Sequence, residues 1–316
     1  MRIAVAGNQW ITRYLLDELG SHGLAPALIV NMPPERSSAI SGYIDLAETA
    51  ARVGAEIYRP DKYSLKSQVD QAALQERGID LLLVFGWQRL IPGWFINSCR
   101  IGAYGVHGGP ELPPRCRGRA VFNWAILLGY DRFHMYAFEL NEGVDEGNIV
   151  GLETFDILPE DDVLTLYHKN CVVSTRLFLD IASAAAKGEV RGTPQANEGA
   201  TYLPKRAPEN GGISWAQPAK RVVDLVRALA PPYPGAFTDC GDARIFIQRA
   251  QLFDTRIAYE GEPGTIVDVF PNGHFVVIAS DASVYVREWT VASNFRPQKN
   301  ARFDLISGVS LPDPVM

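Results

Sequence analysis

The stretch from residue 102 to 126, GAYGVHGGPELPPRCRGRAVFNWAI, gathers several chemically active side chains around one histidine. His107 ends an apolar run and is followed by Gly108 and a second glycine, which let a ligand approach the backbone closely. Arg115, Arg117 and Arg119 come next, and their guanidinium groups suit a phosphate or a carboxylate. An imidazole beside such cations predicts acid–base chemistry on an anionic substrate. The structural alternative is a half-buried histidine that closes a strand.

A carboxylate that could orient this imidazole follows in the segment NEGVDEGNIV. Asp145 lies there between glycines, on a loop expected at the edge of a sheet. A histidine paired with an aspartate, with no serine or cysteine nucleophile evident beside them, indicates acid–base work on a nucleophile that the substrate supplies. Cys116 lies in the arginine loop, and we interpret it as structural. Taken alone, Asp145 is better interpreted as a turn former in a hairpin.

The segments that must position these residues alternate between strand-like and helix-like patterns. Short apolar runs predict strands, and amphipathic stretches between them predict helices at 10–23 and 40–54. This alternation predicts a Rossmann-like, mostly parallel sheet with helices on both faces. Because ligands of such sheets bind beyond the carboxyl ends of the strands, we expect His107 at that edge. The predicted strands are 2–7, 25–32, 55–58, 80–86 and 101–108.

The second half of the chain predicts the end of this sheet and then a smaller domain. Segments 132–140 and 147–157 predict two further strands arranged as a hairpin, and a long helix is expected over 162–187. One more helix, at 217–230, is followed by closely spaced strands typical of a small antiparallel, OB-like β-barrel. These strands are predicted at 244–250, 264–270, 274–280 and 283–289. The predicted domains are a Rossmann-like catalytic domain at 1–190, a linker at 191–212 and a carboxyl-terminal β-barrel domain at 213–316.

Composition excludes several classes of function. The 316 residues carry a net charge of −6, which disfavours a protein that lives on nucleic acid or on an anionic membrane. The four cysteines lie far apart without zinc-like spacing, so we expect reduced thiols and no metal. The chain starts without a signal-peptide pattern and has no stretch long enough to span a bilayer, which favours a cytoplasmic location. The first strand is followed by Gly7 alone rather than G-x-G-x-x-G, which argues against NAD or FAD.

The motif around His107 is similar to that of the formyltransferases that use 10-formyltetrahydrofolate. HGGPELPPRCRGRAVFNWAI, followed by GVDEGNIV, resembles the histidine, the arginine–glycine loop and the D-x-G of that superfamily. TLYHKNCVVSTRLF, ANEGATYLPKRAPENGGISW and VVDLVRALAPPYPGAF most resemble the nucleotide-sugar N-formyltransferases, such as those acting on UDP-4-amino-4-deoxy-L-arabinose. EPGTIVDV resembles the β-barrel that follows the catalytic domain there and in methionyl-tRNA formyltransferase. The likeness covers nearly the whole chain in order.

The resemblance implies roles for individual residues. It makes His107 the catalytic histidine and Asp145 the aspartate that supports it. It places the pteridine of the folate cosubstrate against the segment FGWQRLI and the residue before the aspartate. It places the amine acceptor against the arginine loop and the YPG turn. The residues so implied are Phe85, Gly86, Trp87, Leu90, Ile91 and Val144 for the folate, and Gly108, Arg115, Arg117, Gly118, Arg119 and Tyr233 for the acceptor.

One departure from the family pattern lies two residues before the histidine. The family has an asparagine there, whose amide donates to the formyl oxygen as the tetrahedral intermediate forms, whereas this chain has Gly105. Loss of one such donor typically costs about 2.7–4 kcal/mol of transition-state stabilisation. The loop from His107 to Gly118 is also longer here than in the family. Either this longer loop supplies another donor, from a glycine N–H or an arginine, or the protein is a weakened or non-catalytic folate-binding relative.

The function that the resemblance implies is N-formyl transfer from 10-formyltetrahydrofolate to the primary amine of a nucleotide-linked amino sugar. Methionyl-tRNA or a hydroxyornithine-type amine is the alternative acceptor. Against methionyl-tRNA, the linker and the carboxyl-terminal domain are not clearly basic. The expected partners are therefore small molecules rather than nucleic acid or membrane, and the resemblance leaves a homodimer open.

Overall fold

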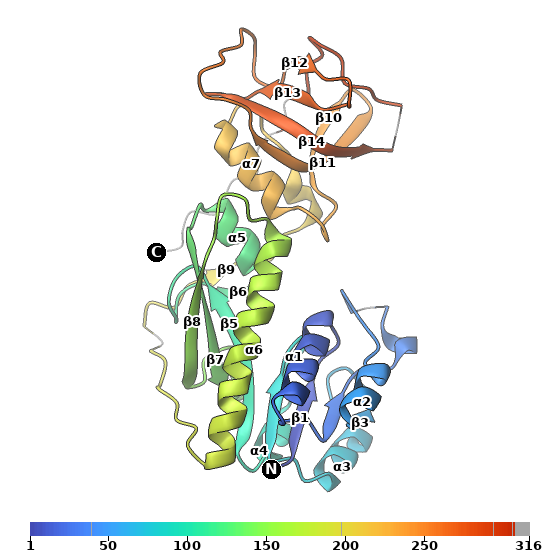
Figure 1. Ribbon diagram of the computed structural model, residues 1–316, viewed down its shortest axis with the longest axis vertical. Helices are drawn as coiled ribbons and strands as arrows, with labels where there is room; N and C mark the ends of the chain where they lie inside the picture. Colours follow the sequence, from blue (N-terminus) through green and yellow to red (C-terminus); the bar gives the residue numbers. More distant parts are fainter. Residues whose placement is uncertain (39, 197, 293, 305, 307–316) are drawn as a thin grey trace. The chain divides into compact units, whose positions relative to one another are not determined.

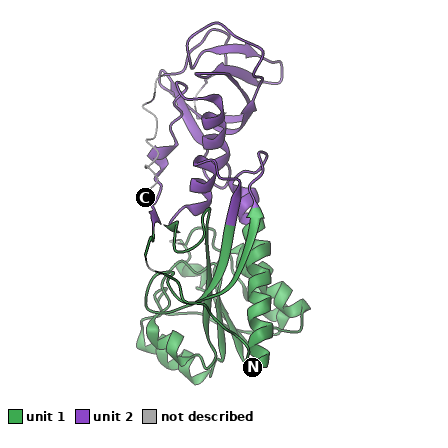
Figure 2. Ribbon diagram, turned by 90° about the vertical axis from the view of Figure 1, so that its left-hand side faces the viewer, with its two compact units in different colours: residues 1–117, 134–155, 169–200 green, residues 118–133, 156–168, 201–316 purple. Residues whose placement is uncertain are grey.

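The computed structural model describes residues 1–38, 40–196, 198–292, 294–304 and 306. The chain divides into two compact units, each assembled from three segments (Figure 2). Unit 1 comprises residues 1–117, 134–155 and 169–200, and unit 2 comprises 118–133, 156–168 and 201–316. In the described ranges, no helix is both long and apolar enough to cross a bilayer. The domain boundaries at 190 and 213 stay predictions.

The larger sheet has seven strands in the order β3-β2-β1-β4-β5-β7-β8 (Figure 1). Strands β1 to β5 pair in parallel, and β7 runs antiparallel to β5. The prediction of a mostly parallel α/β sheet is confirmed. The strands are β1 (Ile3–Ala6), β2 (Leu28–Val30), β3 (Glu56–Tyr58), β4 (Leu81–Val84), β5 (Gly102–Gly109), β7 (Arg132–Glu139) and β8 (Ile149–Asp156).

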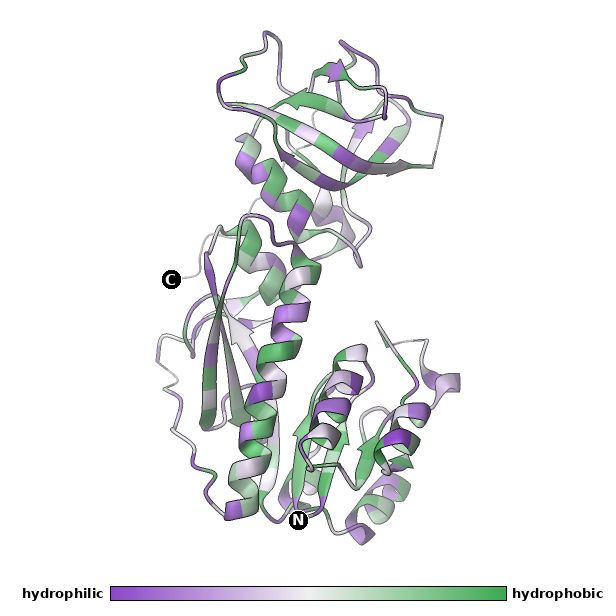
Figure 3. Ribbon diagram, in the orientation of Figure 1, coloured by the Kyte–Doolittle hydropathy of each residue, from purple (hydrophilic) through white to green (hydrophobic). Residues whose placement is uncertain are grey.

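The inner strands of this sheet are buried because they are continuous apolar runs. Every residue of β1 is buried, as are the first three residues of β4. Figure 3 shows the hydrophobic character of these strands. A strand covered on both faces requires such a run, whereas a half-exposed strand would alternate. Leu74 and Phe95, which come from helices, complete the same core.

The helices connect the strands, and two of them, α3 and α4, have no counterpart among the sequence predictions. Both are short, and α4 has only one buried side chain, Phe95, so a helical period is hard to recognise there. The helix predicted at 40–54 begins only at Ala47. The helices are α1 (Trp10–Ser21), α2 (Ala47–Val53), α3 (Gln68–Glu76), α4 (Gly93–Ser98), α5 (Val121–Leu127) and α6 (Val163–Lys187), with a 3-10 turn η1 (Pro34–Arg36).

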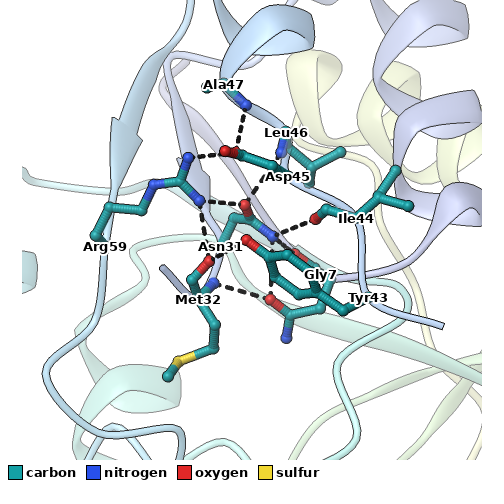
Figure 4. Close-up of polar contacts among 10 residues, drawn as sticks. Gly7, Asn31, Met32, Tyr43, Ile44, Asp45, Leu46, Ala47 and Arg59 are labelled. Atoms are coloured by element: carbon teal, nitrogen blue, oxygen red, sulfur yellow. Dashed lines mark hydrogen bonds and ion pairs between the residues drawn. The ribbon is translucent and has the colours of Figure 1, made fainter. Parts of the chain in front are cut away.

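The helix α2 begins late because side chains at the carboxyl end of β2 make hydrogen bonds with the chain that precedes it (Figure 4). Asn31 Nδ2 donates to the carbonyl of Ile44, and Asn31 Oδ1 accepts from the N–H of Leu46. Arg59 donates to the same Oδ1 and forms an ion pair with Asp45. These bonds hold the chain before α2 in an irregular conformation against the sheet edge. The amide of Asn31 is therefore occupied by protein groups.

Unit 2 contains a five-stranded antiparallel sheet in the order β10-β11-β14-β13-β12. The prediction of an antiparallel sheet after residue 213 is confirmed, and β10 is an additional strand that the sequence does not predict. Trp215 and Phe303 stack in its core with ring centroids 5.6 Å apart. The elements are α7 (Ala219–Ala228), β10 (Ala236–Cys240), β11 (Ala243–Leu252), β12 (Ile266–Val269), β13 (Phe275–Ile278) and β14 (Ser283–Val291).

The segment 191–212, predicted as a linker, carries regular hydrogen bonding. Thr193 exchanges two backbone hydrogen bonds of 2.8 Å with Ile149, the first residue of β8. Further on, the short strand β9 (Tyr202–Leu203) forms a two-stranded sheet with β6 (Arg117–Gly118). A 3-10 turn η2 (Pro208–Gly211) follows. The first residues of this segment are thus fastened to the large sheet.

Candidate active site

His107 lies near the carboxyl end of β5, opposite the loop that joins β7 to β8. Its Nδ1 is 3.7 Å from Oδ2 of Asp145, which is longer than a hydrogen bond but within the range of an ion pair. The side chain of His107 is 15% exposed and that of Asp145 is 27% exposed. The structure therefore brings together the imidazole and the carboxylate that were paired from the sequence.

The surroundings of His107 favour its neutral form. Burial lowers the pKa of the imidazole below its ordinary 6.5, and this is the largest influence. The negative charge of Asp145 and a hydrogen bond with the backbone of Cys116 raise the pKa, while the positive charge of Arg117 lowers it. Nε2 is buried and has no hydrogen-bond partner among the described residues. A neutral imidazole with a free nitrogen can accept a proton at neutral pH.

Tyr136 is the neighbour of His107 on the adjoining strand, and sequence reasoning missed it. The two residues are register partners between β5 and β7, and their rings meet edge-on with centroids 5.8 Å apart. The Tyr136 side chain is fully buried, and within the described part of the chain its hydroxyl has no hydrogen-bond partner. Burial raises the pKa of this phenol, so it stays protonated. Only the correct register between β5 and β7, which places Tyr136 directly opposite His107, could have revealed it.

Gly105, where the family has an asparagine, lies on the same strand two residues before His107. The space beside it is filled by the side chain of Leu140: a Cβ at position 105 would lie 2.9 Å from Leu140 Cδ2 and 3.6 Å from Phe138 Cζ. The missing amide is therefore replaced by apolar packing rather than by another hydrogen-bond donor at that point.

The three arginines of the loop have three different environments. Arg115 is exposed and pairs with Glu111 at 2.8 Å. Arg117 is buried: the residue is only 1% exposed, and its Nη2 donates to Gln195 Oε1 at 2.9 Å. Its Nε is also buried and has no hydrogen-bond partner among the described residues, and its contact with a substrate stays a prediction. Arg119 is exposed.

The other residues predicted to contact the acceptor are divided between the two units. Gly108, in unit 1, is buried within β5 and pairs with Met135 of β7. Gly118 and Tyr233 belong to unit 2. The hydroxyl of Tyr233 shares a 2.8 Å hydrogen bond with the hydroxyl of Tyr167.

The residues predicted to contact folate lie after β4 and in the loop of Asp145. Gly86 has a positive φ of 78°, which favours glycine and turns the chain out of the strand. The remaining side chains divide by exposure. Phe85, Trp87 and Ile91 are buried, whereas Leu90 and Val144 are exposed by 63% and 52%.

A cavity of about 280 Å³ lies beside the loop that carries Asp145. Its walls are Ile96 of α4, Gly102 and Ala103 of β5, and residues 139–141 and 146–148. The carboxylates of Glu139 and Glu146 are among its polar groups. None of the residues predicted for folate lines it. No group of three or more His, Cys, Asp or Glu side chains in the described ranges could hold a metal ion.

The fold and the site define an α/β protein with an acid–base pair at a sheet edge and a separate antiparallel domain. Comparison with known families is more specific. Residues 1–180 match the family described as formyl transferase, and residues 205–294 match the formyl transferase C-terminal domain. This chain therefore belongs to the formyl transferase family. The resemblance seen in the sequence is confirmed at that level.

Solved structures with the same fold include proteins of different length. HypX from Aquifex aeolicus is 18% identical with a TM-score of 0.66, over 93% of this chain and 45% of HypX, so the chain spans less than half of that protein. WlaRD, a sugar 3N-formyl transferase, is 15% identical with a TM-score of 0.65, over 93% of this chain and 99% of WlaRD. An N-formyltransferase from Helicobacter canadensis is 14% identical with a TM-score of 0.64, over 91% of this chain and 99% of its own. At these identities the likeness establishes the fold alone.

Proposed function

We propose that this protein transfers a formyl group from 10-formyltetrahydrofolate to the primary amine of a nucleotide-linked amino sugar. The observation that carries the proposal is the pair itself: His107 Nδ1 is 3.7 Å from Asp145 Oδ2 in a chain of the formyl transferase family. Burial keeps the imidazole neutral, which is the state that an acid–base role in amine attack requires.

The choice of substrates is supported by what the similar structures hold. WlaRD was solved with dTDP and 5-N-formyl-THF, and the Helicobacter canadensis enzyme with folinic acid and dTDP-3-aminofucose. HypX was solved in complex with tetrahydrofolic acid. A folate is common to all three, whereas dTDP, alone in WlaRD and linked to an amino sugar in the Helicobacter canadensis enzyme, belongs to the two proteins that this chain matches over almost their whole length.

The folate site that we propose lies after β4, against the segment from Phe85 to Ile91 and the residue before Asp145. Gly86 turns the chain out of β4 at its carboxyl end, which is the edge of the sheet toward which β5 carries His107. The cavity of about 280 Å³ is a different place, because Gly102 and Ala103 in its wall open β5 and precede His107 on an extended strand. The pteridine ring is therefore placed after β4, with its formyl-bearing end directed toward His107.

In the proposed reaction, the acceptor amine attacks the formyl carbon and forms a tetrahedral intermediate. His107 Nε2 accepts the proton that the amine loses, while Nδ1 faces Asp145. The resulting imidazolium is stabilised by the carboxylate and offsets the charge on the formyl oxygen. The bond from the formyl carbon to N10 then breaks, and the proton passes to N10 to leave tetrahydrofolate. Holding two substrates side by side supplies much of the rate.

An acceptor panel tests this proposal. The full chain is incubated with 10-formyltetrahydrofolate and, in separate reactions, a dTDP-linked amino sugar, a UDP-linked amino sugar, hydroxyornithine and methionyl-tRNA. Mass spectrometry then detects the N-formyl product. We expect formylation of a nucleotide-linked amino sugar and none of the same amino sugar without its nucleotide.

Other outcomes of the panel overturn the proposal in distinguishable ways. Formylation of methionyl-tRNA or hydroxyornithine alone would keep the reaction but replace the acceptor. Calorimetric binding of 5-formyltetrahydrofolate without turnover of any acceptor would make the protein a non-catalytic folate-binding homologue, as the loss of the asparagine at Gly105 allows.

A further inference from the structure

We propose that Gln195 is a positioning residue that fixes the Asp145 carboxylate against His107. The inference rests on the proposed function for the role of the pair, and on the hydrogen bonds of unit 1 for its geometry. Gln195 Nε2 donates to the backbone carbonyl of Asp145 at 3.1 Å and to that of Gly147 at 2.7 Å. Its Oε1 accepts from Arg117 Nη2 at 2.9 Å. One side-chain amide thus joins the arginine loop to the loop of the carboxylate.

The orientation of this amide is determined by its partners. A guanidinium can only donate, and a peptide carbonyl can only accept. Arg117 must therefore face the oxygen of Gln195, and the two carbonyls must face its nitrogen. The guanidinium of Arg117 is buried, and a charged donor in such a place makes a strong hydrogen bond. The arrangement cannot be reversed without losing all three bonds.

Gln195 is itself held by the backbone around it. Two residues earlier, Thr193 exchanges hydrogen bonds of 2.8 Å in both directions with Ile149. Gly192 passes so close to the residue before β8 that a Cβ there would lie 2.6 Å from Cβ of Asn148. The segment is therefore anchored on the sheet at Thr193. Gln195 lies only two residues further on, so its side chain is held within reach of the loop that carries Asp145.

The backbone of Asp145 needs such support. Its φ is +55°, a left-handed conformation that is disfavoured for residues other than glycine. The two bonds from Gln195 reach the carbonyls on either side of Glu146 and so fix the peptide groups next to Asp145. The carboxylate is in this way kept 3.7 Å from Nδ1 of His107.

Loss of Gln195 should therefore be visible in the titration of His107. The groups that act on this imidazole are the Asp145 carboxylate, the Arg117 guanidinium and the backbone of Cys116, with the Tyr136 ring against it. Asp145 raises the pKa of His107. If the carboxylate is no longer held, that contribution weakens and the pKa falls further.

The test is a double-mutant cycle read by NMR titration of the full chain labelled at its five histidines. We expect Gln195→Ala and Asp145→Asn each to lower the pKa of His107, by up to about one unit, which is a tenfold change in proton affinity. In the Asp145→Asn background, Gln195→Ala should change the pKa little further, because the carboxylate is already absent. Equal effects of Gln195→Ala with and without the carboxylate, or no effect at all, would overturn the proposal.

Two further variants sharpen the cycle. Gln195→Met keeps the length and the neutral charge of the side chain but cannot donate to the two carbonyls, so we expect a pKa shift like that of Gln195→Ala. A wild-type pKa in Gln195→Met would contradict a role for the carbonyl bonds even if the alanine variant failed to fold. Gln251→Ala is the matched control, because Gln251 Oε1 also accepts from an arginine, Arg287, at 3.2 Å.

The titration does not depend on turnover, so it separates this proposal from the proposed function. If no acceptor is formylated but the cycle shows coupling, positioning by Gln195 stands and the assigned reaction fails. If formyl transfer is observed and Gln195→Ala leaves both the pKa of His107 and kcat unchanged, only the positioning role fails.

Discussion

The imidazole of His107 combines two opposing influences on its proton affinity. Burial disfavours the charged form, while Asp145 favours it, and burial is the larger of the two. A base that is neutral at physiological pH and gains a stabilising counter-charge on protonation suits removal of a proton from an attacking amine. In the proposed reaction, the carboxylate thus contributes most after the proton has been transferred.

This balance predicts the pH dependence of formyl transfer. Because the pKa of His107 is below 6.5, the acid limb of kcat/KM should lie below pH 6.5, and the rate should be lost as the pH falls through that limb. Asp145→Asn removes a contribution that raises the pKa, so it should move the limb to still lower pH while it reduces kcat. Rate profiles from pH 4.5 to 8 check both statements. A limb above pH 6.5 in the wild type would contradict the assignment of a buried, neutral His107.

The packing at Gly105 makes a second prediction at the scale of one residue. Gly105→Asn brings a Cβ within 2.9 Å of Leu140 Cδ2, so the variant should lose about 1–3 kcal/mol of unfolding free energy through overpacking. Leu140→Ala should make the same substitution less costly, because the obstructing methyl group is absent. Urea unfolding of the two single variants and the double variant measures this coupling. Strictly additive effects would show that Leu140 does not occupy the space of the missing side chain.

Some of these residues could be read from the sequence, and others could not. His107 and Asp145 belong to short motifs with recognisable neighbours, so their types and order along the chain pointed to them. Gln195 lies in a polar stretch with no periodicity, and only the hydrogen bonds of Thr193 show that this stretch is fastened to the sheet. Arg117 was expected to face a substrate because the sequence does not report burial, and the structure shows its guanidinium bonded to Gln195.

The element that carries Asp145 is the loop from 140 to 148 between β7 and β8. It begins beside Gly105, where Leu140 packs, and ends where Asn148 bonds Glu139 through both backbone and side chain. Between these points Gly147 passes very close to β7. The loop is therefore closed on itself at its base, which limits how far the carboxylate can move.

Gly147→Ala tests this tightness. A Cβ at that position would lie 1.7 Å from the carbonyl oxygen of Glu139, so the backbone would have to move. We expect a loss of about 1–3 kcal/mol in unfolding free energy, together with a fall in kcat, because the loop carries the carboxylate. The control is Gly20→Ala in α1, where a Cβ meets Val53 at an ordinary 3.5 Å and the helix should gain about 0.5–1 kcal/mol. A Gly147→Ala variant with wild-type stability and kcat would show that the loop is not constrained there.

At the scale of elements, strong patterns were sufficient for most of the large sheet. The apolar runs of β1 and β4 and the long amphipathic pattern of α6 correspond to observed elements. The predicted start of α2 was wrong. A polar network around Asn31, which joins residues distant in sequence, holds the chain before Ala47 in an irregular conformation. The short helices α3 and α4 have two and one buried residues, too few for a helical period to be distinctive. The edge strand β10 has its three buried residues in succession and so shows no alternation.

The whole molecule combines two compact units with no excess of positive charge. A net charge of −6 gives little electrostatic attraction to RNA, which is consistent with a small acceptor rather than methionyl-tRNA. The acceptor that we propose, a small molecule rather than a nucleic acid, agrees with this charge.

The central claim is that His107, supported by Asp145, carries out formyl transfer from a folate. The most direct measurement is the rate of formyl transfer by His107→Asn, made alongside calorimetric binding of 5-formyltetrahydrofolate to the same variant. We predict that the folate analogue binds as it does to the wild type, while kcat falls by about 10²–10⁴. A variant that binds the analogue and keeps most of the wild-type kcat would contradict the account.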